Sequence, residues 1–218
     1  MNSVSSVIRK KNKDVIIHIP CEMIAHGVRH CVSGIPGIAS VQQLEYRPDK
    51  PMSLCSLRPG AIVVLDVNDH HAQRAQTFAF LHAWQIYYPE VRIIALTRNR
   101  HPRLLSYLSA LGLNAIISLY DPVTVFQAIF IRSMDFCEQV QLSPLIRNLL
   151  PEEMPKKLTC REVQVLEKLF NGKSVSMIAE ELSRDIRTIS THKRRAMEKL
   201  NLRSEKDLHQ LGWTVTGK

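Results

Sequence analysis

Residues 185–200 read DIRTISTHKRRAMEKL, and the rest of the chain is organised around them. Ile189, Ala196 and Leu200 recur with the period of an α-helix, so they predict one buried helical face. The opposite face is polar and basic, and it carries Ser190, Thr191, Lys193, Arg194 and Arg195. Short hydroxyl side chains permit close approach to a DNA groove, and arginines reach guanine edges or phosphates. The stretch therefore predicts a DNA-reading helix.

A basic helical face alone is often only a solvated surface, but the flanking residues favour a DNA-binding motif. Thr159 and Glu162 have the spacing of a capping box, which predicts the start of a helix, and Gly172 predicts its end. Side chains that cap further helices follow at Ser174, Asp185 and Ser204. Four helices with a tight turn between the second and third predict a helix-turn-helix domain.

Spaced motifs run without a gap through this region: Leu158-Thr159-x-Arg161-Glu162-x-x-Val165-Leu166, Gly172-x-Ser174, Ile178-Ala179-x-x-Leu182, Thr188-Ile189-x-x-His192 and Lys199-Leu200. They resemble the LuxR/NarL-type DNA-binding domain. The resemblance implies base contacts from Ser190, Thr191 and Arg194, and phosphate contacts from Thr188, Lys193 and Lys199. It also implies that the helix beginning at Ser204 pairs two such domains on DNA.

The charge of the chain is concentrated near the same helix. The 218 residues carry a formal net charge of +9, with a pI near 9.5. Residues 184–203 contain seven cationic and two acidic side chains, which is over half of that excess. Such a basic stretch favours double-stranded DNA as the partner and predicts strongly salt-dependent binding.

The N-terminal half has a different pattern, in which strands alternate with helices. Strands are predicted at residues 15–19, 41–46, 61–66, 91–97 and 115–118, and helices at 22–32, 72–88, 104–111 and 123–136. This alternation predicts an α/β doubly wound sheet of five parallel strands. We expect a flexible basic arm at 1–13, this domain at 14–137, a linker with one short helix at 138–157, and the DNA-binding domain at 158–218.

The N-terminal half resembles the receiver domain of response regulators. In that alignment Asp66 matches the phosphate-accepting aspartate and Thr97 the hydroxyl residue that senses phosphorylation. Receivers hold magnesium with two adjacent acidic residues, but Ile19 and Pro20 occupy those places here, and Leu119 replaces the lysine. Phosphoryl transfer needs charge compensation and oxygen ligands for the metal. Asp66 and Thr97 are therefore predicted to be vestigial.

Other features limit the possible functions. No glycine-rich phosphate loop and no nucleophile–base spacing is present, so we expect no enzyme, no cofactor and no bound metal. The five cysteines lack metal-ligand spacing, which favours a reduced, cytoplasmic chain. The sequence has no signal peptide and no apolar run of about eighteen residues, so we expect no membrane association.

These patterns predict a sequence-specific transcription regulator with a degenerate receiver, which works without phosphorylation as a homodimer or a heterodimer with a related response regulator. One alternative is an orthodox response regulator, phosphorylated at Asp66, whose magnesium site recruits Glu22 or Asp69. Another is a regulator that senses a small ligand in the receiver crevice. A hydrolase or phosphatase fused to a DNA reader has only Asp66 in its favour.

Overall fold

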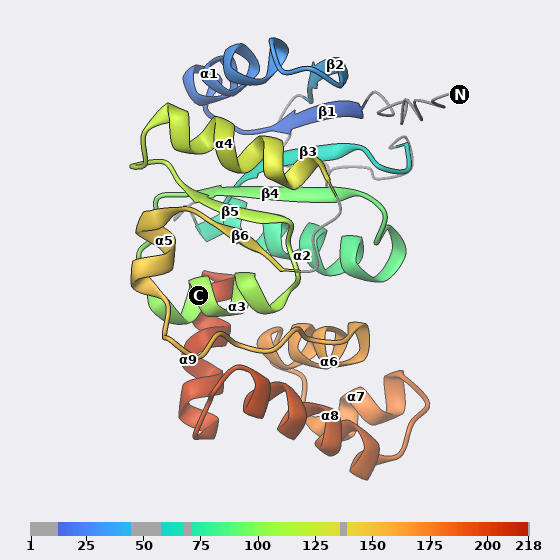
Figure 1. Cartoon of the computed structure of the whole chain (residues 1–218). Coiled ribbons are helices and arrows are strands. Elements are labelled where there is room, and N and C mark those ends of the chain that lie inside the picture. The colour runs from blue at the N-terminus through green and yellow to red at the C-terminus, as the bar shows by residue number, and fades with distance from the viewer. Residues whose placement is uncertain (1–12, 45–57, 68–70, 136–138, 218) are drawn as a thin grey trace, which may run out of the picture.

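The computed structural model of the chain describes residues 13–44, 58–67, 71–135 and 139–217 (Figure 1). The predicted basic arm, apart from residue 13, and Asp69 of the alternative magnesium site lie outside these ranges.

The N-terminal half contains a parallel sheet with the strand order β2-β1-β3-β4-β5-β6. Its strands are β1 (Lys13–His18), β2 (Ile38–Gln43), β3 (Ile62–Asp66), β4 (Arg92–Thr97), β5 (Ala115–Ser118) and β6 (Gln141–Leu142). The predicted α/β fold is confirmed, because β3 and β5 are buried along their whole length, as strands covered on both faces are.

The sheet has six strands in the described residues, whereas five were predicted. The additional strand, β6, has two residues and lies inside the segment predicted as a linker. It pairs with β5, and the Ser143 hydroxyl that follows it accepts a 3.0 Å hydrogen bond from the Ser118 amide. This non-local pairing holds the start of the segment against the sheet, and helix α5 (Pro144–Leu149) continues from it.

Helices cover both faces of the sheet. Helices α1 (Glu22–Ser33) and α4 (Val123–Met134) lie on one face, and α2 (His71–Tyr87) and α3 (Pro102–Ala110) lie on the other (Figure 1). Each face has its own hydrophobic core. Because both faces of the sheet are covered, the carboxyl ends of β3 and β4, where Asp66 and Thr97 lie, are the expected place for functional groups.

The C-terminal half consists of the four predicted helices, α6 (Cys160–Phe170), α7 (Val175–Glu181), α8 (Ile186–Lys199) and α9 (Glu205–Thr216). Each helix begins at a side-chain cap that the sequence indicated: Thr159, Ser174, Asp185 and Ser204. The Thr159–Glu162 capping box is present in both directions, with Thr159 N donating to Glu162 at 2.7 Å. Gly172 follows α6 with a φ of +85°, a conformation that favours glycine.

The two halves share a hydrophobic core, because α6 and α9 pack against α2 and α3 (Figure 1). The ring of Tyr107 on α3 meets Phe170 on α6 edge to face, with centroids 5.7 Å apart. Gln85 on α2 donates to the carbonyl oxygens of Leu111 and Leu158, each at 3.1 Å. Apolar contacts and backbone hydrogen bonds therefore both hold the C-terminal helices on this face.

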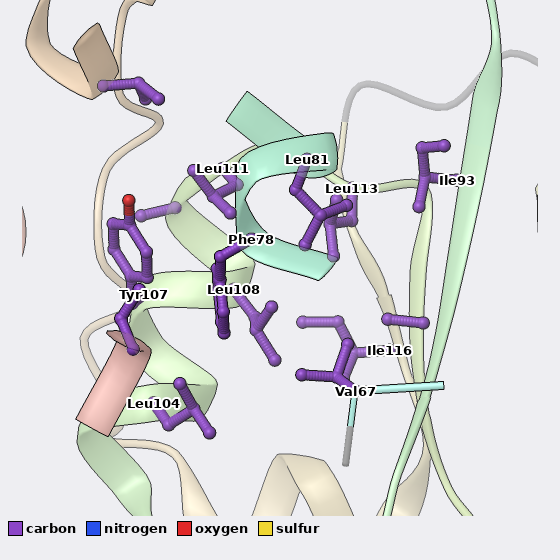
Figure 2. Packing of buried hydrophobic residues seen from close by; sticks show 14 of the residues in the cluster. Val67, Phe78, Leu81, Ile93, Leu104, Tyr107, Leu108, Leu111, Leu113 and Ile116 are labelled. Atoms are coloured by element: carbon purple, nitrogen blue, oxygen red, sulfur yellow. The ribbon is translucent and has the colours of Figure 1, made fainter. Parts of the chain in front are cut away.

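A polar pair lies inside the shared core. Tyr107 is fully buried, with Phe78 and Leu108 beside it (Figure 2), and its hydroxyl is 2.7 Å from Nε2 of His82, which is 2% exposed. Burial lowers the pKa of His82 to about 4. Burial, together with the nearby Glu167 carboxylate, raises the pKa of Tyr107 well above its ordinary value. Both groups are therefore neutral in the folded protein at neutral pH.

We expect His82 to make the folded state sensitive to acid. Its folded-state pKa of about 4 lies below the unfolded value of 6.5, so its contribution is full above that value and is lost as the pH falls toward 4. This group alone should lower the free energy of unfolding by roughly 2 kcal/mol between about pH 8 and pH 5.

Urea denaturation at both pH values measures this difference. His82→Gln should remove it while keeping a hydrogen-bonding group near Tyr107, and His209→Gln, at an exposed position on α9, should leave it unchanged. An equal pH dependence in all three proteins would show that His82 is not the titrating group.

Candidate nucleic-acid interface

The candidate interface is built on α8, which the domain core holds from one side. Ile189 and Ala196 are buried, and Ile189 packs in a small cluster with Val165 of α6 and Ile178 of α7. Asp185 caps the helix by accepting a 2.7 Å hydrogen bond from the Arg187 amide. The helix is therefore fixed at its start and along its inner face before any ligand is bound.

The turn between α7 and α8 sets the angle at which α8 leaves the core. Ser183 has a φ of +50°, and the next amide, that of Arg184, donates to the Ala179 carbonyl at 2.9 Å. Glu181 at the end of α7 accepts from Lys168 and Lys173, each at 2.6 Å. These contacts join α6, α7 and the turn, so the helix-turn-helix geometry is fixed by the protein itself.

The outward face of α8 lies at the end of the molecule away from the sheet (Figure 1). Thr188, Ser190 and Arg194, three of the predicted DNA contacts, are exposed there, and the Arg194 side chain is 73% accessible. Thr191 is half-buried, and its hydroxyl donates to the Arg187 carbonyl at 2.8 Å. The structure therefore brings the predicted base-reading residues together on one helix, while the Thr191 hydroxyl proton is used within the helix.

Two residues on this surface received no role from the sequence. Arg187 is exposed one turn before Ser190 and two turns before Arg194, so it shares their face. Ile186, at the first position of α8, is 52% exposed although it is apolar. The i, i+3, i+7 spacing of Arg187, Ser190 and Arg194 could have placed Arg187 on the DNA-reading face. Nothing in the sequence marked Ile186 as exposed.

The two predicted phosphate-binding lysines both have acidic partners within the domain. Lys193 Nζ is 2.7 Å from Glu205 Oε2, and Lys199 Nζ is 2.7 Å from Glu162 Oε2. Their side chains are only 19% and 24% exposed. An ammonium group has three donors, so an ion pair leaves room for a phosphate contact. The pairing shows that each lysine also connects α8 to another helix.

Glu162 is the most deeply buried of these charged groups, at 2% exposed. Burial by itself raises the pKa of Glu162, but the hydrogen bonds from Lys199 and Thr159 and the charge of Lys199 hold that pKa below its ordinary value. The carboxylate is therefore ionised at neutral pH, and Lys199 balances its charge inside the domain.

The receiver-like positions lie at the carboxyl edge of the sheet. Asp66 ends β3 and is 4% exposed, and Thr97 ends the neighbouring β4 and is fully buried. The Thr97 hydroxyl donates to the Val67 carbonyl at 2.9 Å and accepts from the Asn99 amide at 3.0 Å. Its single proton is therefore directed at the backbone of the Asp66 loop, where it stabilises the connection between the two strands.

Three positions near this edge of the sheet do not offer the charged groups that a phosphorylation site uses there. Ile19 is buried at 1% exposed, and Leu119 packs against the core on the α1 side of the sheet. Glu22, an alternative magnesium ligand, is largely exposed and accepts from Gln43 Nε2 at 3.0 and 2.9 Å. Its carboxylate is thus bound to β2.

The described residues show neither a metal site nor a membrane-spanning helix. They contain no group of three or more His, Cys, Asp or Glu side chains that could hold a metal ion. None of their helices is both long enough and apolar enough to cross a membrane. Cys21, Cys31 and Cys160 carry free thiols, and the other two cysteines lie outside the described ranges.

Comparison with known families identifies the C-terminal half. Residues 156–211 match the family model described as "Bacterial regulatory proteins, luxR family". The predicted LuxR-type helix-turn-helix domain is therefore confirmed at the C-terminus.

Comparison with individual proteins extends the similarity into the N-terminal half. The chain is 24% identical to the transcriptional regulatory protein RcsB of Escherichia coli K12 over 198 residues, covering 89% of this chain and 91% of RcsB. It is 25% identical to the transcriptional activator protein BglJ of the same organism over 149 residues, which is 68% of this chain and just under two thirds, 65%, of BglJ.

Solved structures of RcsB have the same fold. One, described as two RcsB dimers bound to two parallel DNAs, has a TM-score of 0.54 and 24% identity, covering 94% of this chain and 100% of that chain. Another, of the Salmonella typhimurium RcsB response regulator, has a TM-score of 0.52 and 24% identity, covering 92% and 97%. The N-terminal half is therefore receiver-like in fold, as predicted.

We expect Lys199→Met to destabilise the protein, because it leaves the buried Glu162 carboxylate without its cationic partner. The free energy of unfolding should fall by about 2 to 4 kcal/mol, while Lys199→Arg should retain most of the stability. Chemical denaturation measures both variants against Lys206→Met, an exposed control on α9. An undiminished stability of Lys199→Met, together with weaker DNA binding, would instead make phosphate contact its main role.

Proposed function

We propose that this chain, with its LuxR-type helix-turn-helix domain, is a DNA-binding transcription regulator of the RcsB and BglJ type. In this proposal it reads specific double-stranded sequences through α8 and acts without phosphorylation. The supporting observation is the exposed, basic outer face of a helix whose inner face and start are fixed by the core. The DNA partner implies a cytoplasmic location, and we expect no catalysis.

The composition of this face supports sequence reading as well as charge attraction. Ser190 is short enough to let the helix backbone approach base edges, and Arg187 and Arg194 are exposed one turn before and one turn after it. Arg184 and Arg195 are also exposed and would meet phosphates on the two strands. In this proposal, base contacts come from Ser190, Thr191 and Arg194, and Thr188, Lys193 and Lys199 contribute phosphate contacts.

Independence from phosphorylation is supported by the surroundings of the vestigial site. A phosphoryl group on Asp66 would need a metal ion and a nearby cation, but Ile19 and Leu119 are apolar and Glu22 is bound to Gln43. Thr97 already donates its hydroxyl proton to Val67. Ile19 and Leu119 are thus apolar, and Glu22 and Thr97 already bind groups within the chain.

We propose that assembly with a second receiver-like chain replaces this switch. The outer side of α1 and α4 exposes the apolar residues Met23, Val123 and Ile131, at 84%, 59% and 48%. The two helices are neighbours, since Gln127 of α4 donates to the Cys31 carbonyl of α1 at 3.3 Å. In this proposal, these exposed side chains contact the partner, which is a second copy or a related response regulator.

We expect Arg194→Ala to weaken binding to the preferred DNA sequence by about 1 to 3 kcal/mol and to relax the choice of base at one position. Selection of binding sites from a random DNA library, followed by titration of the selected site, measures both effects. Arg161→Ala removes an exposed arginine from α6, outside the candidate interface, and should change neither. Equal weakening on all sequences would assign Arg194 to phosphate rather than to a base.

We expect the phosphate donor acetyl phosphate to change neither the mass of the protein in solution nor its affinity for DNA. Asp66→Ala should behave like the unsubstituted chain in light scattering and in DNA titration, provided that both are folded by circular dichroism. Modification of Asp66 in high yield, detected by mass spectrometry and accompanied by tighter DNA binding, would establish the orthodox response regulator instead.

A further inference from the structure

A cavity lies where the N-terminal domain meets the turn between α8 and α9. Its volume is about 540 Å³, and it is lined from three sides by the start of α3, by residues 149–151 at the end of α5, and by residues in the range 200–211. Small-molecule sites in proteins have volumes of roughly 300–1,000 Å³ and often lie between domains. The volume of this cavity falls within that range, and the cavity lies between the two domains.

The walls of the cavity are both apolar and polar, and they come from both domains. Leu149 and Leu150 contribute from the N-terminal side, and Leu202 and Leu211 contribute from the C-terminal side. Leu150 and Leu211 are buried behind this surface, whereas Leu149 and Leu202 are half-buried and keep part of their surface accessible. The accessible parts of Leu149 and Leu202 would contact an aliphatic or aromatic body.

The polar groups of the cavity do not favour a cationic ligand. Asp207 is its acidic residue, and Asp207 Oδ1 already accepts from Arg103 at 2.7 Å. Its other oxygen, Oδ2, accepts from the Ser204 hydroxyl at 2.9 Å and from the Arg203 amide at 3.2 Å. A ligand ammonium group would therefore have to compete with these three donors.

The two arginines that line the cavity differ in their ion pairs. Arg103 is bound to Asp207 and Gln210. Arg203 also lines the cavity, and no acidic group among the described residues forms an ion pair with its guanidinium. Ser106 adds a hydroxyl on the α3 side. The cavity therefore offers an apolar body site with an available cation at its rim.

We propose that this cavity binds a small amphipathic anion, whose apolar body lies against the leucines and whose carboxylate or similar group pairs with Arg203. Such a ligand touches both domains at once, so it stabilises the observed packing of α9 beside α3. The site differs from the receiver crevice, because it is formed by α3 and the α8–α9 turn rather than by Asp66. It does not rest on the proposed DNA-binding function.

Isothermal titration of the full-length chain with octanoate, and with its uncharged counterpart octanamide, tests the proposal without DNA. Octanoate should bind with one-to-one stoichiometry, and octanamide about tenfold more weakly, because charge-assisted hydrogen bonds are the stronger kind. Failure of octanoate to bind in a saturable way would overturn the proposal.

Variants then locate the site. Arg203→Gln should reduce octanoate affinity to about that of octanamide while leaving octanamide binding unchanged. Ser106→Phe, which fills the cavity from α3, should abolish the binding of both. Arg161→Gln, which removes an exposed arginine outside the cavity, is the matched control and should bind both normally.

The outcomes separate clearly. Since Arg203→Gln alters an exposed side chain, it gives a result even if Ser106→Phe does not fold. Octanoate binding that is insensitive to Arg203→Gln would exclude the anion-binding role, and binding that survives Ser106→Phe in a folded protein would place the ligand elsewhere. A failure of the chain to bind DNA, measured in a separate assay, would contradict only the proposed function, because the octanoate titration contains no DNA.

Discussion

The arrangement of the two halves depends on how one buried hydroxyl group is satisfied. Tyr107 is fully buried between α3 and the C-terminal helices, and a phenol in that position needs a hydrogen-bond partner. His82 supplies it from α2, and the ring of Phe170 from α6 closes over the edge. The same few side chains thus complete the N-terminal core and form the surface on which α6 and α9 pack. Apolar packing and the hydrogen bond of the buried hydroxyl therefore favour the same arrangement of the two halves.

Features that depend on neighbouring residues could be predicted from the sequence. A cap needs only a side chain that reaches an amide two or three positions along, so Thr159, Ser174, Asp185 and Ser204 marked the helix starts correctly. Buried strands such as β3 were recognised because both faces of the sheet are covered and the run is continuously apolar. The outward face of α8 follows from the helical period in the same way.

Features that depend on distant residues could not be predicted. Strand β6 has two residues, too few for any periodicity, and it exists because β5 and Ser118 offer partners more than twenty positions away. The ion pair between Lys199 and Glu162 spans 37 positions and gives a structural role to a lysine that looked free to meet DNA. The interface of α6 and α9 with α2 and α3, including its cavity, likewise arises from tertiary packing alone.

The short sixth strand also limits the length of the free connection between the two halves of the chain. Because β6 and α5 are fixed to the sheet, the covalent connection to the DNA-binding helices consists of residues 150–159. Ten extended residues span at most about 35 Å. A helix-turn-helix domain that separated from α2 and α3 would therefore stay within about 35 Å of the end of α5. Its rebinding to α2 and α3 would be an intramolecular event at a high effective concentration. The docked arrangement therefore competes strongly with any external partner for the surface of α9.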